Sequence, residues 1–222
     1  MIRLFRKDSI WYDNYVVNTL ELYGTGGAKL YHIKDDKRSK RSARFIYLAL
    51  DSLLDEKNYD DISITEVIQR SEIGRSTFYR NFDSLDDILK YECDRKFIDL
   101  KKDVQMKFKG PNNRNMTHPL SLILPFLEYW YQDSRIIELL LKSNNRNIFI
   151  NNIEQIVMGL EKISFIDNKA PIHSYAVNIR TYIIASIILT WITNNKDLTP
   201  KELHKHLLIH FDQTIMINNN SK

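Results

Sequence analysis

The sequence predicts an all-α protein with a small helical head followed by a longer helical body. Only 6 glycines and 5 prolines occur among 222 residues, which favours long uninterrupted helices over a turn-rich β fold. Apolar side chains also recur at the three- and four-residue spacing of helices along most of the chain. We divide the sequence into an N-terminal extension (residues 1–36), a head (37–92) and a body (93–222).

Composition narrows the class of protein. Hydrophobic residues make up 43% of the chain, so it has enough apolar material for a packed core. The net charge of +4 permits an anionic partner without requiring one. The single cysteine, Cys93, cannot form an internal disulfide, which fits a reducing cytoplasm. No secretory signal core is present, and the most apolar run, residues 183–192, is too short to span a bilayer. We therefore predict a cytoplasmic protein with no membrane partner, and a buried helix at that run.

The N-terminal extension contains one helical pattern. Residues 9–23 form a short amphipathic helix in this prediction, followed by the glycine-rich stretch 24–27, which we interpret as a flexible connector. The glycines lack the spacing and the following Ser or Thr of a phosphate-binding loop. The apolar stripe consists of Trp11, Tyr15, Asn18 and Leu22, with Tyr12, Val16 and Leu20 beside it.

The head begins with a basic run and a helix. Residues 34–44 are dense in positive charge, and apolar residues then repeat at helical spacing, which predicts a helix over about 38–57. Its predicted apolar face consists of Phe45, Leu48, Ala49, Ser52 and Leu53.

Two shorter helices follow, joined by a tight turn. Ser63 and Glu66 have the spacing of a capping box, so a second helix begins at Ile64 and runs to about Arg70. The sequence SEIG forms the turn, and a third helix covers residues 75–81. The expected shared core of the head consists of Ile64, Val67, Ile68, Ile73, Phe78, Phe45, Leu48 and Phe82.

The remaining elements are also helices. Ser84 and Asp87 repeat the capping pattern before a fourth helix. Pro119, Pro171 and Pro200 each stand where a first helical turn tolerates proline. The predicted body helices cover about 119–131, 134–143, 146–164, 172–194 and 200–216.

The third helix of the head exposes a distinctive polar set once its apolar residues face the core. A major groove of B-DNA admits one helix, and its base edges offer acceptors to arginine and to hydroxyl groups. Ser, Thr and Tyr hydroxyls also reach phosphate oxygens. A solvated helix face is the alternative, but the preceding turn and the core spacing favour DNA. The exposed set consists of Arg75, Ser76, Thr77, Tyr79, Arg80 and Asn81.

The stretch ITEVIQRSEIGRSTFYRNF, residues 64–82, resembles the DNA-binding domain of the TetR/AcrR family of bacterial transcription regulators. The family pattern is a helix-turn-helix followed by Thr/Ser-x-Tyr-x-x-Phe, matched here by Thr77, Tyr79 and Phe82. The match covers about residues 40–92. The stretch YIIASIILTWITNNKDLTPKEL is similar to the last two helices of the branch that includes the DhaS-like regulators. Residues 1–36 have no counterpart in this resemblance.

The resemblance implies a partner set and a mechanism. It implies a homodimer formed through the last two helices (about 172–216), a palindromic operator in double-stranded DNA, and a small-molecule effector that binds the body. It therefore implies a cytoplasmic, nucleoid-associated bacterial protein. Position by position, the implied contacts to bases and phosphates are Thr65, Arg75, Ser76, Thr77, Tyr79 and Arg80.

This sequence departs from the family pattern at two places. Asn81 stands where the family often has histidine, and Leu85 stands where it often has lysine at the start of the fourth helix. Asp86 and Asp87 follow, and we expect these acids to repel a phosphate backbone. The basic run before the first helix is either a solvated charge run or a phosphate or minor-groove contact. Its members are Lys37, Arg38, Lys40, Arg41 and Arg44.

Aromatic residues cluster in the body, where they either pack the core or line an effector pocket. The residues predicted for the pocket are Phe126, Tyr129, Trp130, Tyr175, Asn178 and Tyr182. His206 and His210 lie one helical turn apart, but a surface or dimer-face position is favoured over a metal site. No enzyme motif appears, so we predict no catalytic residue, no metal and no cofactor.

The sequence thus favours a homodimeric repressor that a small molecule releases from its operator. One alternative is an activator or coactivator. Another is a protein-interaction module with weak DNA binding. For the extension, two hypotheses stay open: it covers the body or the dimer interface, or it contacts DNA through Arg3, Arg6 and Lys7.

Overall fold

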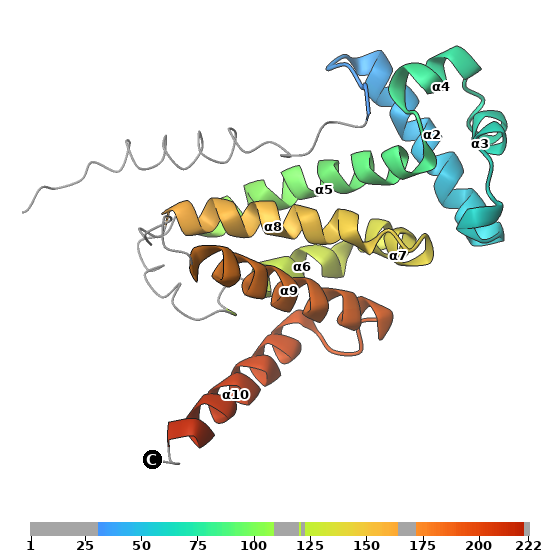
Figure 1. Ribbon diagram of the computed structural model, residues 1–222. Helices are drawn as coiled ribbons and strands as arrows, with labels where there is room; N and C mark the ends of the chain where they lie inside the picture. The colour runs from blue at the N-terminus through green and yellow to red at the C-terminus, as the bar shows by residue number, and fades with distance from the viewer. Residues whose placement is uncertain (1–30, 109–119, 121–122, 164–171, 220–222) are drawn as a thin grey trace, which may run out of the picture.

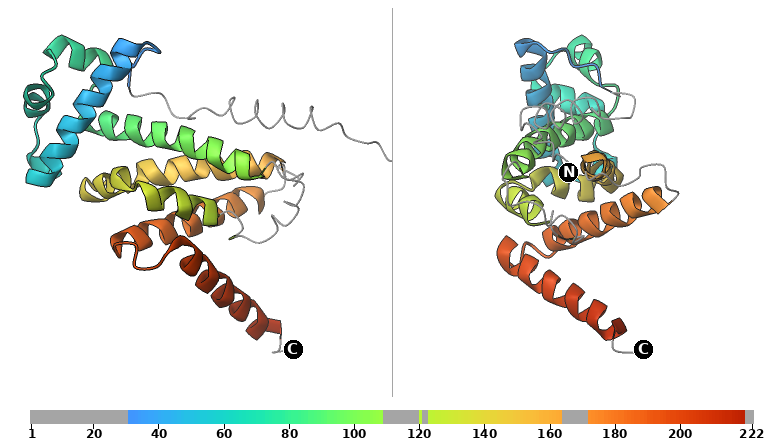
Figure 2. Two further views of the ribbon diagram at one scale, coloured as in Figure 1. Left: turned by 180° about the vertical axis from the view of Figure 1, so that it is seen from behind. Right: turned by 90° about the vertical axis from the view of Figure 1, so that its left-hand side faces the viewer.

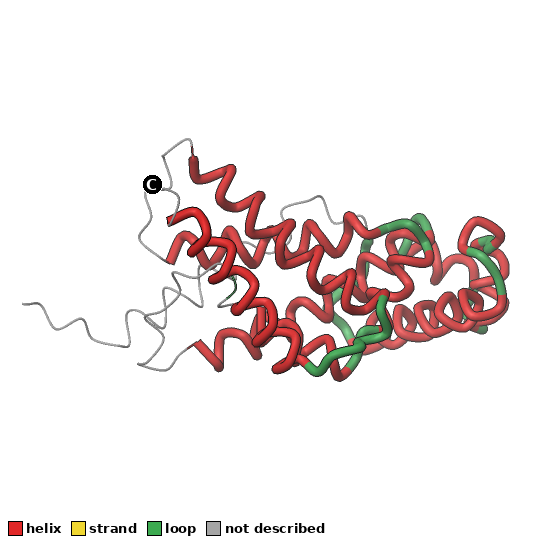
Figure 3. The backbone as a smooth tube through the Cα atoms, turned by 90° about the horizontal axis from the view of Figure 1, so that it is seen from below, coloured by secondary structure: helices red, strands yellow, loops and turns green. Residues whose placement is uncertain are grey.

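The computed structural model describes residues 31–108, 120, 123–163 and 172–219, and every regular element in those ranges is helical (Figure 1). The predicted all-α fold class is confirmed. Figure 3 shows the same result as a tube of helices joined by short loops. The predicted helix at residues 9–23 lies outside the described residues.

The head consists of three helices whose ends follow from local hydrogen bonds. α2 (Lys37–Glu56) begins after Asp36, whose carboxylate accepts a hydrogen bond from the Ser39 N–H at 2.8 Å. α3 (Ile64–Ser71) begins with the predicted capping box between Ser63 and Glu66. A single 3₁₀ turn at Tyr59–Asp61 precedes it and was not predicted.

The turn between α3 and α4 (Arg75–Asn81) begins at Glu72, which adopts a left-handed conformation with φ of 54°. The residue that ends α3 is therefore not a glycine. Phe78 and Phe82 are fully buried and hold α4 against the rest of the head. This helix-turn-helix arrangement was expected from the sequence.

The body begins with α5, which runs from the head along the length of the body (Figure 1). Ser84 and Asp87 form the predicted reciprocal cap: the Ser84 N–H donates to Asp87 at 2.9 Å, and the Asp87 N–H donates to the Ser84 hydroxyl at 3.2 Å. The body helices are α5 (Leu85–Phe108), α6 (Ile123–Gln132), α7 (Arg135–Lys142), α8 (Arg146–Ile163), α9 (Ile172–Thr193) and α10 (Pro200–Asn219).

An aromatic cluster fixes the centre of the body. The rings of Phe97, Trp130 and Phe149 contact one another with centroid separations of 5.4–5.8 Å, and all three side chains are buried. α8 packs against α9, whereas α10 packs near α6 and extends away from the other body helices (Figure 2).

The predicted inward face of α2 was partly wrong. Phe45 and Leu48 are 41% and 42% exposed, whereas Ile46 and Leu50 are fully buried. The error has a geometric cause: α2 has apolar residues around more than half of its circumference, and spacing alone does not say which part meets α3, α4 and α5.

α9 is buried on one face only. Ile184, Ile188 and Trp191 face the body core, while Tyr175 and Ile179 are exposed. The expectation of a buried helix at residues 183–192 holds only for the inner face. Residues 174–193 are long and apolar enough to cross a membrane by length and composition alone, a test that core helices of soluble proteins also pass. Its packing against α8 fits a helix of the folded body.

Candidate nucleic-acid interface

α4 has an exposed polar face, and its opposite side packs into the head. Phe78 is fully buried, and because Tyr79 follows it directly, Tyr79 lies at the edge of the exposed face and is 43% exposed. The Arg75 guanidinium lies 6.0 Å from the centroid of the Tyr79 ring, and Arg80 donates a hydrogen bond to the half-buried Thr77 hydroxyl at 3.4 Å. Arg75, Ser76, Tyr79 and Arg80 are therefore accessible to a large ligand.

Asn81 does not belong to this exposed face. Its side chain is fully buried: the amide nitrogen donates to the Thr77 carbonyl at 2.7 Å, and the amide oxygen accepts from the Ser39 hydroxyl at 3.4 Å. The Asn81 carbonyl also accepts a hydrogen bond from the His32 N–H at 2.9 Å. The prediction that Asn81 faces outward was wrong: its side chain ties the end of α4 to α2, and its backbone carbonyl ties it to the chain before α2.

Thr65 lies in the first turn of α3 and is exposed beside the capping box. The Glu66 carboxylate accepts hydrogen bonds from the Ser63 N–H at 2.9 Å and from the Lys57 ammonium at 2.5 Å. The Lys57 ammonium is the largest of the causes that lower the pKa of Glu66 to about 2. The start of α3 is thus fixed in place, and its N-terminal backbone dipole favours an anion near Thr65.

The basic run divides into paired and outward-facing side chains. Lys40 forms an ion pair with Asp35, and Arg44 contacts Glu92 at 3.5 Å and lies over the Tyr47 ring. Lys37, Arg38 and Arg41 are exposed at the start of α2, close to the α4 end of the head (Figure 1). The outward-facing members of the run are therefore the ones placed to contact phosphate.

The two acids at the start of α5 have structural partners. Asp87 is buried and caps the helix, with its carboxylate accepting from the N–H groups of Asp83 and Ser84 at 2.9 Å. Asp86 remains exposed, but it accepts a hydrogen bond from the Asn145 amide at 2.7 Å and from the Tyr59 hydroxyl. These contacts join the head to the loop between α7 and α8, and they account for both acids without a role near DNA.

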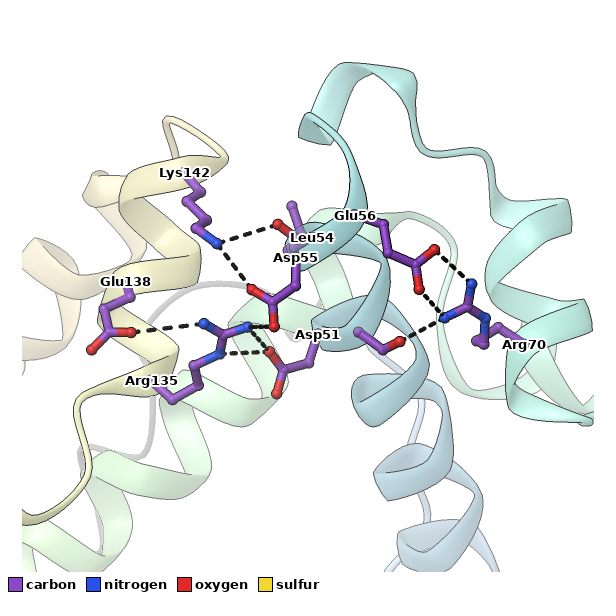
Figure 4. A network of polar contacts seen from close by, with 9 residues as sticks. Asp51, Leu54, Asp55, Glu56, Arg70, Arg135, Glu138 and Lys142 are labelled. Atoms are coloured by element: carbon purple, nitrogen blue, oxygen red, sulfur yellow. Dashed lines mark hydrogen bonds and ion pairs between the residues drawn. The ribbon is translucent and has the colours of Figure 1, made fainter.

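A second set of contacts joins the head to the body (Figure 4). The Arg135 guanidinium of α7 bonds Asp51 at 2.7 Å and Asp55 at 2.6 Å, both on α2. Lys142, also on α7, reaches Asp55 at 3.1 Å and the Leu54 carbonyl at 3.2 Å. The Arg135 hydrogen bond is the main reason that the pKa of Asp55 lies below its usual range. We call Arg135, Lys142, Asp51 and Asp55 the α2–α7 clamp.

The clamp continues to α3. Arg70 forms a two-point ion pair with Glu56 at 2.7 and 2.8 Å, and it donates to the Ser52 hydroxyl at 2.6 Å (Figure 4). α3, α2 and α7 are therefore linked by charged contacts that sequence analysis did not predict. The partners on α2 and α7 lie 80 or 84 positions apart in the sequence, and a lone basic residue carries no signal of so distant a partner.

Comparison with known proteins identifies the body. Residues 117–213 match the family described as transcriptional regulator C-terminal region, TetR_C_8. This match supports a place for the chain in the TetR/AcrR family of transcriptional regulators. The match agrees with the resemblance of residues 64–82, which lie outside the matched range, and the family it names consists of transcriptional regulators, which are not enzymes.

One solved structure, that of Lin0861, shares the fold of this chain, and a second shows a weaker similarity. The protein Lin0861 of Listeria innocua is 15% identical, with a TM-score of 0.63 over 84% of this chain and 99% of its own. A transcriptional regulator from Aquifex aeolicus is 19% identical, with a TM-score of 0.49 over 78% of this chain and 99% of its own. No curated protein matches the regulator.

The residues predicted for an effector pocket do not lie together. Phe126 and Trp130 are fully buried in the packed core of the body, and Tyr129 donates its hydroxyl to the Lys96 carbonyl at 2.9 Å. Tyr175, Asn178 and Tyr182 lie on the exposed face of α9, so the prediction that they line an interior pocket was wrong. The aromatic residues alone did not indicate which faces of the body helices are buried and which are exposed.

The other candidate sites of the regulator are structural. Cys93 is buried, and burial raises the pKa of its thiol well above the usual range, which opposes a redox role. His206 and His210 lie on an exposed part of α10. Among the described residues, no group of three or more His, Cys, Asp or Glu side chains is placed to hold a metal ion.

Proposed function

We propose that this regulator is a homodimeric repressor that binds a palindromic operator through α4 and leaves it when a small molecule occupies the body. The observation that carries the proposal is the exposed set Arg75, Ser76, Tyr79 and Arg80 on a helix whose opposite side is locked by Phe78. Phosphate contacts around this set come from Lys37, Arg38, Arg41 and Thr65. Thr77 contributes indirectly, because its hydroxyl accepts a hydrogen bond from Arg80. Such a protein works in the cytoplasm, on the nucleoid.

An exposed apolar face supports the dimer. Tyr175, Ile179 and Tyr182 of α9 are 65%, 61% and 59% exposed, and Ile209 of α10 is also exposed. Contiguous exposed apolar residues on one helix face indicate an interaction surface. α9 and α10 of two copies would bury these side chains in a four-helix bundle.

Two buried polar atoms support an effector site in the body. Among the described residues, the Trp130 indole nitrogen and the Thr181 hydroxyl are buried without a hydrogen-bond partner. A buried polar group left unsatisfied costs about 1–3 kcal/mol. Trp130 lies on α6 and Thr181 on α9, two helices that pack together. An effector with polar atoms that entered the body would gain affinity by satisfying either group.

The mechanism follows from the spacing of successive major grooves. Two recognition helices must lie about 34–36 Å apart to enter them together. An effector that binds more tightly to a dimer with a different separation of the two helices shifts the population toward that form. The size of the shift is set by the ratio of the effector's affinities for the two forms, and less of the protein then fits the operator. The α2–α7 clamp is the link through which the body would set the position of each head.

The test is selection of genomic DNA fragments by the full-length protein at near-physiological salt. We expect enrichment of a palindromic site. Replacing Arg75 and Arg80 with alanine should weaken binding to that site by about 10–100-fold and reduce the salt dependence of the remaining binding. Lys102→Ala, which removes an exposed cation from the body, serves as the matched control. Weak binding without sequence preference in the wild type would overturn the proposal and favour a protein-interaction module. A palindromic site at which the regulator increases transcription would identify an activator.

A further inference from the structure

An open cleft with an apolar floor lies in the head, between α2 and the turn that follows α3. Its volume is about 430 Å³, enough for one or two large side chains. Two of its apolar residues, Phe45 and Leu48, remain about two-fifths exposed. The lining residues are Phe45, Leu48, Ala49, Ser52, Arg70, Ser71, Glu72 and Ile73.

The cleft continues into a basic stripe. Arg38, Arg41, Phe45, Leu48 and Ser52 follow one another at spacings of three or four residues, so they share one face of α2. The Arg41 guanidinium lies 5.4 Å from the centroid of the Phe45 ring. Residues 37–50 contain five Lys or Arg residues and no Asp or Glu. At the other end of the cleft, Glu56 is paired with Arg70, and Glu72 is exposed. The whole surface is therefore apolar in the middle and basic toward the start of α2.

The N-terminal segment of the same chain has the complementary pattern. Residues 8–23 contain three acids, Asp8, Asp13 and Glu21, and no Lys or Arg. The sequence predicts an amphipathic helix here whose stripe includes Trp11, Tyr15 and Leu22. An acidic amphipathic helix can place its apolar stripe in an apolar cleft and its acids beside the basic end of that cleft.

The position of Tyr31, the first residue that the structure describes, determines how far residues 8–23 can reach. Tyr31 is held against α5, with its ring 5.2 Å from that of Tyr91 and its hydroxyl donating to Asp94 at 3.1 Å. Residues 24–30 span up to about 23 Å when extended. Phe45 lies about 12 Å along α2 from the first residue of that helix. Residues 8–23 add about 24 Å as a helix, so the segment as a whole is long enough to extend from Tyr31 past the start of α2 to the cleft of its own chain.

We propose that residues 8–23 dock as a helix on this cleft, with their apolar stripe against Phe45, Leu48 and Ile73 and their acids toward Arg38 and Arg41. The docked segment covers part of the basic stripe that we assign to phosphate contact. Docking and DNA binding therefore compete for Arg38 and Arg41. The docking itself does not depend on the regulator being a repressor.

Tryptophan fluorescence tests the docking in the full-length protein. Trp130 and Trp191 are 0% and 2% exposed, so quenching by acrylamide reports mainly on Trp11, and Trp11→Phe isolates its share. We expect Trp11 to be shielded in the wild type. Replacing Phe45 and Leu48 together with glutamine should raise the quenching constant of Trp11 several-fold, while the protein keeps its cooperative thermal unfolding. Ile98→Gln, at a 52% exposed apolar position on α5, is the matched control and should change nothing.

Three results would overturn the proposal. Trp11 could be fully quenchable in the wild type, which would mean that the segment is undocked. Trp11 could be shielded equally in the wild type and the cleft variant, which would place the segment on another surface. Shielding that is lost on dilution to nanomolar concentration would assign the segment to a second copy of the chain. Persistence of shielding on dilution, with loss in the cleft variant, supports docking within one chain.

Discussion

At the scale of single residues, the polar side chains of the head serve mainly to fix helix ends. Asn81 is the clearest case, because its amide closes α4 and joins it to Ser39 of α2. Glu66 does the same at the start of α3, where it binds Ser63 and Lys57. The orientation of α4, the recognition helix in our proposal, thus depends on residues outside its exposed face.

The Glu66 cap makes the stability of the head depend on pH. The pKa of Glu66 is lowered to about 2 in the folded protein, from 4.5 for an ordinary glutamate. A carboxyl group with a lowered pKa stabilises the fold above its unfolded pKa and loses that contribution as pH falls through its folded pKa. We expect Glu66→Gln to lower the free energy of unfolding at pH 7, and the difference from the wild type to shrink as pH falls from about 4.5 to 2. Urea unfolding across that pH range measures it.

Glu154→Gln, on α8 of the body, is the control for the loss of one carboxylate. A difference between Glu66→Gln and the wild type that stays constant from pH 7 to pH 2 would show that the cap does not depend on the charge of Glu66.

At the scale of elements, the α2–α7 clamp holds the head at a fixed angle to the body. Asp51 and Asp55 of α2 both bind Arg135, so removing its guanidinium weakens the link between α2 and α7 and leaves only the contacts of Lys142 in the clamp (Figure 4). We expect Arg135→Met to leave the base preference within each half-site unchanged. The same variant should accept a wider range of half-site spacings, because the two heads are less well positioned. Selection from a DNA library with variable spacing measures both properties at once.

Arg95→Met is the matched control for the clamp. Arg95 pairs with Glu92 and Asp99, all on α5, so its loss removes charged contacts without releasing one element from another. If Arg135→Met and Arg95→Met give the same spacing profile as the wild type, the clamp does not set the head position.

The elements themselves were largely predictable from sequence, whereas their contacts were not. Capping residues such as Ser63 and Ser84 mark helix ends because the bonds they make are local, and the structure confirms both. The inward face of α2 was misassigned at Phe45 and Leu48, because the choice depends on where α3 and α5 pack. The clamp was missed for the same reason: charge patterns identify cations and not their distant partners. The exposed polar set of α4 was predictable apart from Asn81. A helix as short as α4 has too few apolar residues for their spacing to show which way the side chains of its last turn face.

At the scale of the whole molecule, the outer face of α9 decides whether the regulator works as a dimer. Ile179 lies between Tyr175 and Tyr182 on this face and is 61% exposed in the single chain. A glutamate there would place an unpaired charge in the proposed interface, which costs several kcal/mol when it is desolvated. We expect the wild type to sediment as a dimer at micromolar concentration and Ile179→Glu to sediment as a monomer.

Loss of the dimer should also lower affinity for the operator, because a monomer binds one half-site and forfeits the gain from joining two sites. Ile98→Glu introduces the same charge at an exposed apolar position of α5 and should leave both the mass and the affinity unchanged. An Ile179→Glu protein that still sediments as a dimer would exclude α9 as the interface. A monomeric variant that kept the affinity of the wild type would show that each head binds DNA on its own, and would remove the geometric basis for release by an effector.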